Sequence, residues 1–341
     1  MQVFFCVDCP ALQSFFIHRE VGYACVCHCH CSAACIVALR GDGGNADLAA
    51  TTGQHRDAAV AGGQGNGTTE TERARRAQGY HLESQRRTLG DAANVAVPTL
   101  TVFPAKGGGN GTAVLVVPGG GYRVLAMDLE GSEICDWLTG QGITCALLKY
   151  RVPASGPNWD SDCNCRDIPA VPMALQDAQR AMGLLRAQAE RWKIDPKRVG
   201  VIGFSAGGHV VAGLSTHDAR SYVAVDAADA QPSRPDFAMV MYSGHLWTGA
   251  KHGLSLAGDI VVDDAVPPTF IVQATDDPTD DVRESLTYYR ALIGAGVPVE
   301  MHLFARGGHA FGLRVKDAPV AEWPHLAERW MRDIGMLPRV L

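Results

Sequence analysis

The sequence has no excess of basic residues, and this removes one class of partner at the start. Its 341 residues include 30 Lys and Arg against 36 Asp and Glu, for a formal net charge of −6. A protein that binds nucleic acid usually presents a basic face, so we expect no nucleic-acid partner. Hydrophobic residues make up 47% of the chain, which is ample for a buried core.

Long apolar runs are absent after residue 40, and no internal repeat is visible. Residues 21–39 contain no Asp, Glu, Lys or Arg, over nearly the length of a membrane span. They lack the leucine-rich core of a span or of a signal peptide, and the apolar part of a signal peptide would lie nearer the start. We therefore expect no clear membrane segment and no convincing signal peptide, and the localisation stays open between cytoplasm and secretion.

The 11 cysteines do not form the pattern of a disulfide scaffold or of a zinc site. Most of them lie in the first 35 residues, whereas a scaffold would spread them through a small fold. Structural zinc sites use pairs about two to four residues apart together with a distant second pair, and Cys27-His28-Cys29-His30-Cys31 has no such partner. We expect no metal, and zinc titration would test the alternative of a metal-binding or membrane-tethering segment.

Residues 1–90 differ in composition from the rest of the chain. From Arg40 to Arg87 the sequence is rich in Gly, Ala, Thr, Gln, Asn and Arg, with almost no periodic apolar pattern, which is typical of disordered tails. We interpret 1–90 as an N-terminal extension that is disordered or derives from a mis-assigned start codon. Residues 91–341 are expected to form one domain that carries the functional site.

After residue 94, apolar strands alternate with amphipathic helices. The expected strands are 98–103 (an edge strand), 113–117, 143–148, 199–202, 237–242, 269–274 and 299–304. The expected helices are 129–141, 172–192, 282–295 and 320–334, with a further helix after the 199–202 strand. This alternation predicts an α/β fold with a mostly parallel central sheet and helices on both faces.

The segment Val199–His209, VGVIGFSAGGH, places Ser205 between an apolar strand and a helix. This is the context that a G-x-S-x-G motif needs if its serine is to be an exposed nucleophile. The flanking glycines let the chain make the sharp turn. In a chain with 38 glycines, the motif alone also fits a glycine-rich turn with a surface serine.

A nucleophilic serine needs a base and a group that orients the base, and both slots are filled. In hydrolases with this elbow they follow in the order acid, then histidine, at later strand ends. Asp276 and Asp277 follow the 269–274 strand, and we favour Asp277, although aspartates are common in such turns. His309 follows the 299–304 strand between glycines, and we assign it as the base.

Backbone N–H groups are the expected oxyanion donors, from Ala206 and from Gly120 and Gly121 in the PGGGY run at 118–122. The loops 155–166 and 243–267 are long enough to form the walls of a pocket. Its candidate residues are Tyr122, Trp159, Trp247 and Phe311. Ordinary loop packing explains these aromatic residues equally well. We interpret His209 as a packing residue or as one that supports the site without contacting the substrate.

Several segments, taken together, carry a family resemblance: PGGGY at 118–122, LKYR at 148–151, LQDAQRA at 175–181, IDPKR at 194–198, GFSAGGH at 203–209, RPDF at 234–237 and RGGHAFG at 306–312. From residue 98 onward the chain resembles the α/β-hydrolase superfamily, and specifically bacterial carboxylesterases of the acetyl-xylan-esterase-like, xylanase-B-related group. The resemblance implies a Ser205–Asp277–His309 triad, no metal and no organic cofactor.

The same resemblance implies a substrate class, namely short-chain acyl esters, including acetyl groups on xylan-type carbohydrate. The chain departs from the family pattern in two places. It has Gln273-Ala274 where relatives often carry His-Gly, and Tyr242-Ser243-Gly244 where Tyr-Pro is expected. The alternatives are a peptidase or lactone hydrolase on the same triad, or an inactive binding relative, which would lack a triad member.

Overall fold

The computed structural model describes residues 90–153, 172–249 and 253–338, and the backbone of four short strands at 35–42, 45–52, 159–160 and 165–166. All of these belong to one compact unit that begins at Ala33. The segment Cys27–Cys31 lies outside the described residues, so metal binding there stays a prediction. Within the described part of the chain, no helix has the length and apolar character needed to cross a membrane.

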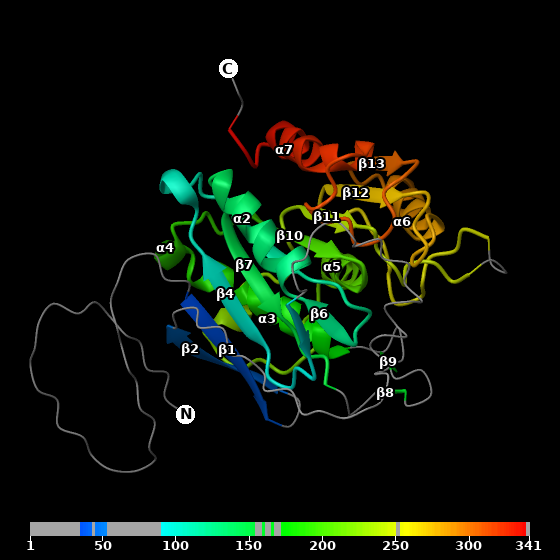
Figure 1. Ribbon diagram of the computed structural model, residues 1–341. Helices are drawn as coiled ribbons and strands as arrows, with labels where there is room; N and C mark the ends of the chain where they lie inside the picture. The colour runs from blue at the N-terminus through cyan, green and yellow to red at the C-terminus, as the bar shows by residue number, and fades with distance from the viewer. Residues whose placement is uncertain are drawn as a thin grey trace, which may run out of the picture. The chain divides into compact units, whose positions relative to one another are not determined.

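A nine-stranded sheet forms the centre of the unit, in the order β13-β12-β11-β10-β5-β7-β4-β1-β2 (Figure 1). The strands from β13 to β7 are parallel to their neighbours, and β4, β1 and β2 are antiparallel. The bounds are β1 (Cys35–Asp42), β2 (Asn45–Thr52), β4 (Thr99–Phe103), β5 (Ala113–Val117), β7 (Thr144–Lys149), β10 (Val199–Phe204), β11 (Ala238–Met241), β12 (Thr269–Ala274) and β13 (Val299–Phe304). The expected mostly parallel sheet is confirmed.

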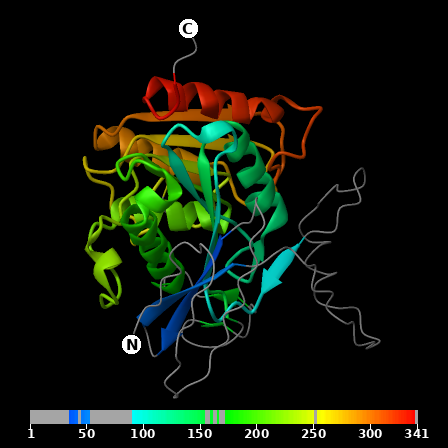
Figure 2. The ribbon, with the colours of Figure 1, turned by 90° about the vertical axis from the view of Figure 1, so that its left-hand side faces the viewer.

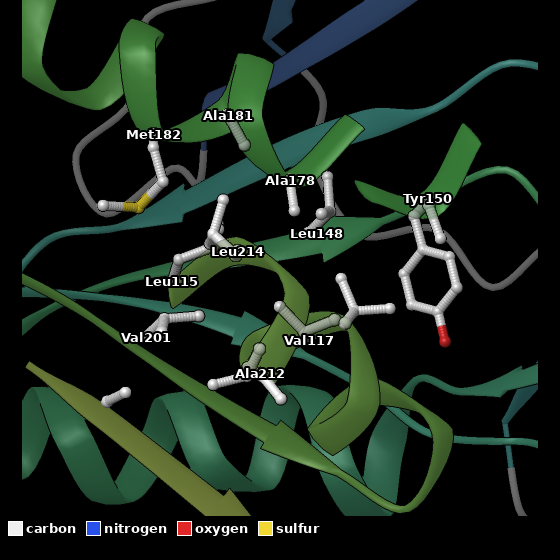
Figure 3. Close-up of a cluster of buried hydrophobic side chains, with 14 of the residues drawn as sticks. Leu115, Val117, Leu148, Tyr150, Ala178, Ala181, Met182, Val201, Ala212 and Leu214 are labelled. Carbon is white, nitrogen blue, oxygen red and sulfur yellow. The ribbon is translucent and has the colours of Figure 1, made fainter. Parts of the chain in front are cut away.

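Helices cover both faces of this sheet, as expected (Figure 2). Side chains of β5 alternate between two cores, with Leu115 and Val117 in one and Val114 and Val116 in the other. The first core is closed by α3 (Pro172–Ala187), α5 (Ala206–Thr216) and α6 (Arg283–Gly294), and Figure 3 shows α3 and α5 side chains against the strands. The second core is closed by α2 (Glu133–Gly140) and α7 (Trp323–Asp333).

The N-terminal boundary of the fold differs from the expected one. The backbone of β1 pairs with β4 and that of β2 pairs with β1, so β4 is not an edge strand. The paired ends Asp42 and Asn45 are separated by two glycines, a composition that short hairpin loops favour. Composition hid this hairpin because the alignment of both strands depends on β4, which is distant in the sequence.

Two expected helices are interrupted. The 129–141 helix begins as a π-helical turn, η2 (Asp128–Ser132), and continues as α2. The 172–192 helix ends at Ala187 and is followed by the short α4 (Ala189–Trp192). The remaining elements are β3 (Asp91–Ala93), which pairs with β6 (Val124–Ala126), the pair β8 (Trp159–Asp160) and β9 (Cys165–Arg166), and the 3-10 turns η1 (Lys106–Gly108), η3 (Ala227–Ala230) and η5 (Pro319–Glu322).

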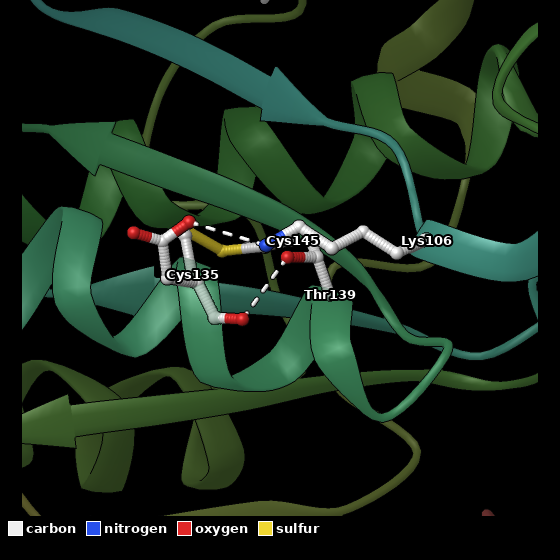
Figure 4. The surroundings of a disulfide bond; sticks show 5 residues. Lys106, Cys135, Thr139 and Cys145 are labelled. Atoms are coloured by element: carbon white, nitrogen blue, oxygen red, sulfur yellow. Dashed lines mark hydrogen bonds and ion pairs between the residues drawn. A yellow bond between two sulfur atoms is a disulfide. The ribbon is translucent and has the colours of Figure 1, made fainter.

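A disulfide joins Cys135 of α2 to Cys145 of β7 (Figure 4). The sequence did not indicate this pair, because the two cysteines are ten positions apart, with the rest of a helix and a turn between them. Crosslinking a loop of this size stabilises a folded chain by about 2 to 3 kcal/mol in the chain-entropy model.

Buried ion pairs explain several of the motif residues that carry no chemistry. On α3, Asp177 accepts from the Arg151 backbone and side chain, and Arg180 pairs with Asp226. Arg186 Nη1 lies 2.9 Å from Asp236 Oδ2. These contacts fix α3 to the loops around it, so the LQDAQRA, LKYR and RPDF segments serve the fold.

Candidate active site

Ser205 and the glycine loop meet where the strand order of the sheet reverses. β5 lies between β10 and β7, and Val117 is opposite Gly203. Ser205 and Gly119 each follow that pair by two residues, and a Cβ on Gly119 would lie 2.7 Å from the Cβ of Ser205. Such a reversal, at the carboxyl ends of parallel strands, is where α/β proteins bind ligands.

The turn at Ser205 has a strained backbone, with φ 51° and ψ −124°, directly before the first residue of α5. The glycines of the motif are required sterically. A Cβ on Gly203 would lie 2.2 Å from the carbonyl oxygen of Gly207, and one on Gly207 would lie 2.2 Å from that of Val117. The sharp turn therefore tolerates no side chain at either glycine.

The three residues expected to act together are in contact. Nε2 of His309 lies 2.9 Å from Oγ of Ser205, and its Nδ1 lies 2.7 Å from Oδ2 of Asp277. The Asp277 side chain is fully buried, and 5% of the His309 side chain is exposed. The chain from hydroxyl to imidazole to carboxylate is thus continuous and largely shielded from solvent.

The neighbouring carboxylate, Asp276, has a different position. Its Oδ1 accepts the backbone N–H groups of Gly307 and Gly308, each at 2.8 Å, in the loop before His309. Asp276 therefore holds the histidine loop, whereas Asp277 contacts the imidazole.

Asp277 is surrounded by hydrogen-bond donors. Its Oδ1 accepts the N–H groups of Thr279 and Asp280, and its Oδ2 accepts Nε2 of Gln273 at 3.1 Å. Gln273 was noted in the sequence only as a departure from the family pattern, and here it supports the acid. The sequence signal that could have identified Gln273 is a polar residue near the end of a mostly apolar strand.

Gly120 and Gly121 adopt positive φ, 128° and 62°, in the loop after β5. A Cβ on Gly120 would lie 2.1 Å from the carbonyl oxygen of Val124, so the loop requires glycine there. No hydrogen bond within the described part of the chain uses the N–H of Gly120, Gly121 or Ala206. These three N–H groups are the ones that the sequence predicts as oxyanion donors.

A buried glutamate, which the sequence analysis missed, links the glycine loop to the histidine. Glu130 accepts the N–H of Gly119 at 2.7 Å and the hydroxyl of Tyr242 at 3.0 Å. The Tyr242 ring packs against His309, with 5.1 Å between ring centroids. Glu130 is 2% exposed, and burial raises its pKa, although its hydrogen bonds and His309 oppose that rise.

A second carboxylate, also missed, faces Ser205. Oδ2 of Asp280 lies 3.4 Å from Oγ of Ser205, which donates to it, and 3.7 Å from Nε2 of His309. Burial raises the pKa of Asp280 to about 6, against the opposing effect of His309. The acid-rich run DDPTDD at 276–281 was the available signal, but its members could not be separated by sequence.

These carboxylates set the titration of His309. Burial lowers its pKa, but the hydrogen bond to Asp277 and the negative charge of Asp280 more than offset that effect. The pKa of His309 is therefore raised above its ordinary value.

Two of the expected pocket aromatics are core residues. Tyr122 is 1% exposed, and its hydroxyl lies 2.7 Å from Nδ1 of His209, whose Nε2 lies 3.0 Å from Asp259. Phe311 is 2% exposed and packs against Tyr242 at 4.4 Å between ring centroids. Neither ring offers an exposed face to a sugar, because each is enclosed by the loops around it.

The two tryptophans have different outcomes. Trp247 is partly exposed, and the Arg283 guanidinium lies 4.0 Å from its ring centroid, so one face of the indole is occupied. Trp159 lies in β8, and its side chain is outside what the structure describes. A cavity of about 490 Å³ between residues 256–262 and α6 includes none of the candidate site residues.

Among all the residues that the structure describes, no group of three or more His, Cys, Asp or Glu side chains is placed to hold a metal ion. The fold and the site together define an α/β-hydrolase domain in which a serine, a histidine and an aspartate are in contact after the carboxyl ends of their strands.

Comparisons with known proteins agree with this class. The family model described as BD-FAE matches residues 102–241, and that of the prolyl oligopeptidase family matches residues 174–333. The crystal structure of an acetyl ester-xyloside bifunctional hydrolase from Caldicellulosiruptor lactoaceticus is 30% identical, with a TM-score of 0.58, covering 71% of this chain and 89% of that one. The chain therefore belongs to the α/β-hydrolase superfamily, as the resemblance predicted.

Curated relatives are similar over part of their length. An acetylxylan esterase of Xylanibacter ruminicola is 29% identical over 66% of this chain and 45% of its own length. Endo-1,4-beta-xylanase B of Butyrivibrio fibrisolvens is 27% identical over 58% of this chain and 32% of its own. The chain thus spans less than half of the curated relatives that it matches. The carboxylesterase Cest-2923 of Lactobacillus plantarum, 22% identical with a TM-score of 0.57, covering 74% of this chain and all of that one, shares the fold.

Proposed function

We propose that the domain is a serine carboxylesterase that hydrolyses short-chain acyl esters, including acetyl groups on xylan-type carbohydrate. The observation that carries the proposal is the unbroken contact from Ser205 Oγ through His309 to Asp277, together with three backbone N–H groups that make no hydrogen bond to any described residue. Similarity to an acetylxylan esterase supports the choice of substrate.

The proposed mechanism follows from the donors and acceptors of the three side chains. A carboxylate oxygen of Asp277 accepts the hydrogen bond from His309, so Nδ1 carries the proton and Nε2 accepts the proton of Ser205. The serine oxygen attacks the ester carbonyl, and the N–H groups of Ala206, Gly120 and Gly121 stabilise the oxyanion. The alcohol leaves with the proton from Nε2, and water then releases the acid from the acyl-enzyme by the same route.

A panel of substrates tests this proposal on the full chain. We expect kcat/KM for p-nitrophenyl acetate to exceed that for the octanoate by at least about tenfold, since a longer chain needs a larger apolar pocket. Acetate release from acetylated xylan should accompany it, and a fluorophosphonate probe should modify Ser205 as read by peptide mass spectrometry.

The match to the prolyl oligopeptidase family spans all three site residues, so the panel includes alanyl p-nitroanilide. Faster cleavage of this amide than of every ester would replace the esterase proposal with a peptidase. No hydrolysis of any substrate by a folded chain would support an inactive binding relative.

The pH dependence of kcat/KM is a separate prediction. His309 must be neutral to accept the serine proton, so activity should fall as the pH drops through its pKa, by about tenfold per pH unit. Since that pKa is raised, the midpoint should lie above 6.5, the ordinary value for histidine. Initial rates with p-nitrophenyl acetate between pH 5 and 9 provide the measurement, and a midpoint below 6 would contradict the described surroundings of His309.

A further inference from the structure

Asp280 has an unusual position for a carboxylate that is not needed to orient the histidine. Its Oδ2 is near both reacting atoms, 3.4 Å from Ser205 Oγ and 3.7 Å from His309 Nε2. A Cβ on Gly244 would lie 2.5 Å from its Oδ1, so the glycine after β11 leaves the space that the carboxylate occupies. Carboxylates thus lie on both sides of the imidazole, Asp277 at Nδ1 and Asp280 at Nε2.

This second carboxylate is unfavourable for ester hydrolysis unless something compensates it. Attack on the ester creates a negative charge close to Ser205, and a nearby anion repels it. The Asp280 side chain is 16% exposed, and among the described residues its carboxylate makes no ion pair with lysine or arginine. Among the described residues, the Ser205 hydroxyl, at 3.4 Å, is the one hydrogen-bond donor to this carboxylate, and Ser205 gives up that proton to His309 when it attacks. A largely buried carboxylate left without a donor is costly, and a hydrogen-bond donor of the substrate would remove that cost.

The position of Asp280 indicates which part of a substrate would supply the donor. The ester oxygen of the leaving alcohol must come within about 3 Å of His309 Nε2 to receive its proton. Asp280 Oδ2 lies next to the same nitrogen, so it faces the leaving alcohol and the carbon next to the esterified one. A hydroxyl on that carbon could donate to Asp280 at an ordinary hydrogen-bond distance of about 2.7 Å.

We propose that Asp280 binds the leaving alcohol and selects esters that carry a free hydroxyl on the carbon next to the esterified one, as in partially acylated polyols. The inference rests on the proposed esterase function and specifies its substrate. Asp280 holds the alcohol through its free hydroxyl, with the ester oxygen directed at His309 Nε2. The hydrogen bond also screens the carboxylate from the developing oxyanion, so the benefit is largest in the transition state.

Three acetate esters of similar size test this inference: 2-hydroxyethyl acetate, 2-methoxyethyl acetate and propyl acetate. The first carries a donor, the second only an acceptor and the third neither. Titration of released acid should show the full-length enzyme preferring 2-hydroxyethyl acetate over the other two by about tenfold or more in kcat/KM, as a hydrogen bond to a charged group predicts.

Asp280→Ala should bring this preference close to one. Propyl acetate has no hydroxyl for Asp280 to bind, so its hydrolysis should change less than that of 2-hydroxyethyl acetate when both are measured well above the His309 midpoint. A merely structural role would instead lower all three rates in parallel and leave the preference intact. Asp281→Ala is the matched control, because Asp281 is a half-exposed neighbour paired with Arg283, and it should keep the wild-type preference.

Thermal unfolding and labelling of Ser205 by the fluorophosphonate establish that each variant is folded with a reactive serine. Hydrolysis of all three esters at equal rates, or a preference that survives in Asp280→Ala, overturns the inference and leaves the esterase proposal standing. Failure of the wild type on all three esters and on p-nitrophenyl acetate overturns the esterase proposal, and this inference with it.

Discussion

Replacing Ser205 with alanine is expected to lower kcat for p-nitrophenyl acetate by roughly 10⁵- to 10⁶-fold, the loss seen when a serine nucleophile is removed. Among the described residues, Ser205 supplies the one hydroxyl in contact with Nε2 of His309, at 2.9 Å, so no other hydroxyl can take its place as nucleophile. The residual rate should come from binding and from the N–H groups of the glycine loop. Steady-state kinetics on purified full-length enzyme provide the measurement.

Ser243→Ala is the matched control for that experiment. Ser243 is a fully buried serine at the end of the neighbouring strand, and its hydroxyl donates to the carbonyl of Gly244 rather than to His309. Losing one such hydrogen bond should change kcat by less than about tenfold. If Ser205→Ala keeps more than about a hundredth of the wild-type rate, after purification that excludes a contaminating esterase, Ser205 is not the nucleophile.

The sequence predicted the central strands well, and the reason is physical. The expected bounds 113–117, 269–274 and 299–304 are those of β5, β12 and β13. β5 and β12 are fully buried and covered by helices on both faces, so β5 is a continuous apolar run and β12 is mostly apolar, with Gln273 as a polar exception. Such runs can be recognised without knowledge of their neighbours.

Elements that depend on distant partners were not predictable in this way. The pairing of β1 and β2 is set by β4, and composition around Arg40 favoured a disordered tail. The break after Ala187 and the π-helical turn at η2 occur within otherwise helical patterns. Local propensity gives a helix there, whereas tertiary contacts decide where it is interrupted.

The same division applies to the candidate site. Ser205, Asp277 and His309 could be proposed because each follows a recognisable strand in the order typical of the family. Glu130 and Asp280 could not, since Glu130 meets Tyr242 across 112 positions and Asp280 meets Ser205 across 75. Periodicity and motif spacing contain no information about such pairs. The contacts of Glu130 and Asp280 can be identified only in the folded structure, where the sheet brings the loops together.

The choice between the two neighbouring aspartates leads to the second large expected effect. Asp277→Asn should lower kcat by about 10⁴-fold, because the amide that replaces the carboxylate can donate to Nδ1 of His309. Nε2 would then carry the proton and could no longer accept the proton of Ser205. Asp276→Asn should lower kcat by less than about tenfold, since an amide oxygen can still accept from Gly307 and Gly308.

Comparing these two variants, which differ by one position and carry the same chemical change, separates the orientation of the imidazole from the support of its loop. Asp276→Ala should fall between them, because it removes the oxygen that accepts both N–H groups and loosens the segment before His309 while Asp277 remains in place. Kinetics at a pH well above the His309 midpoint avoid confusing a shifted pKa with a lost tautomer. An Asp276→Asn enzyme as impaired as Asp277→Asn would reverse the assignment of the acid, since the loop contacts that survive in that variant could not explain such a loss.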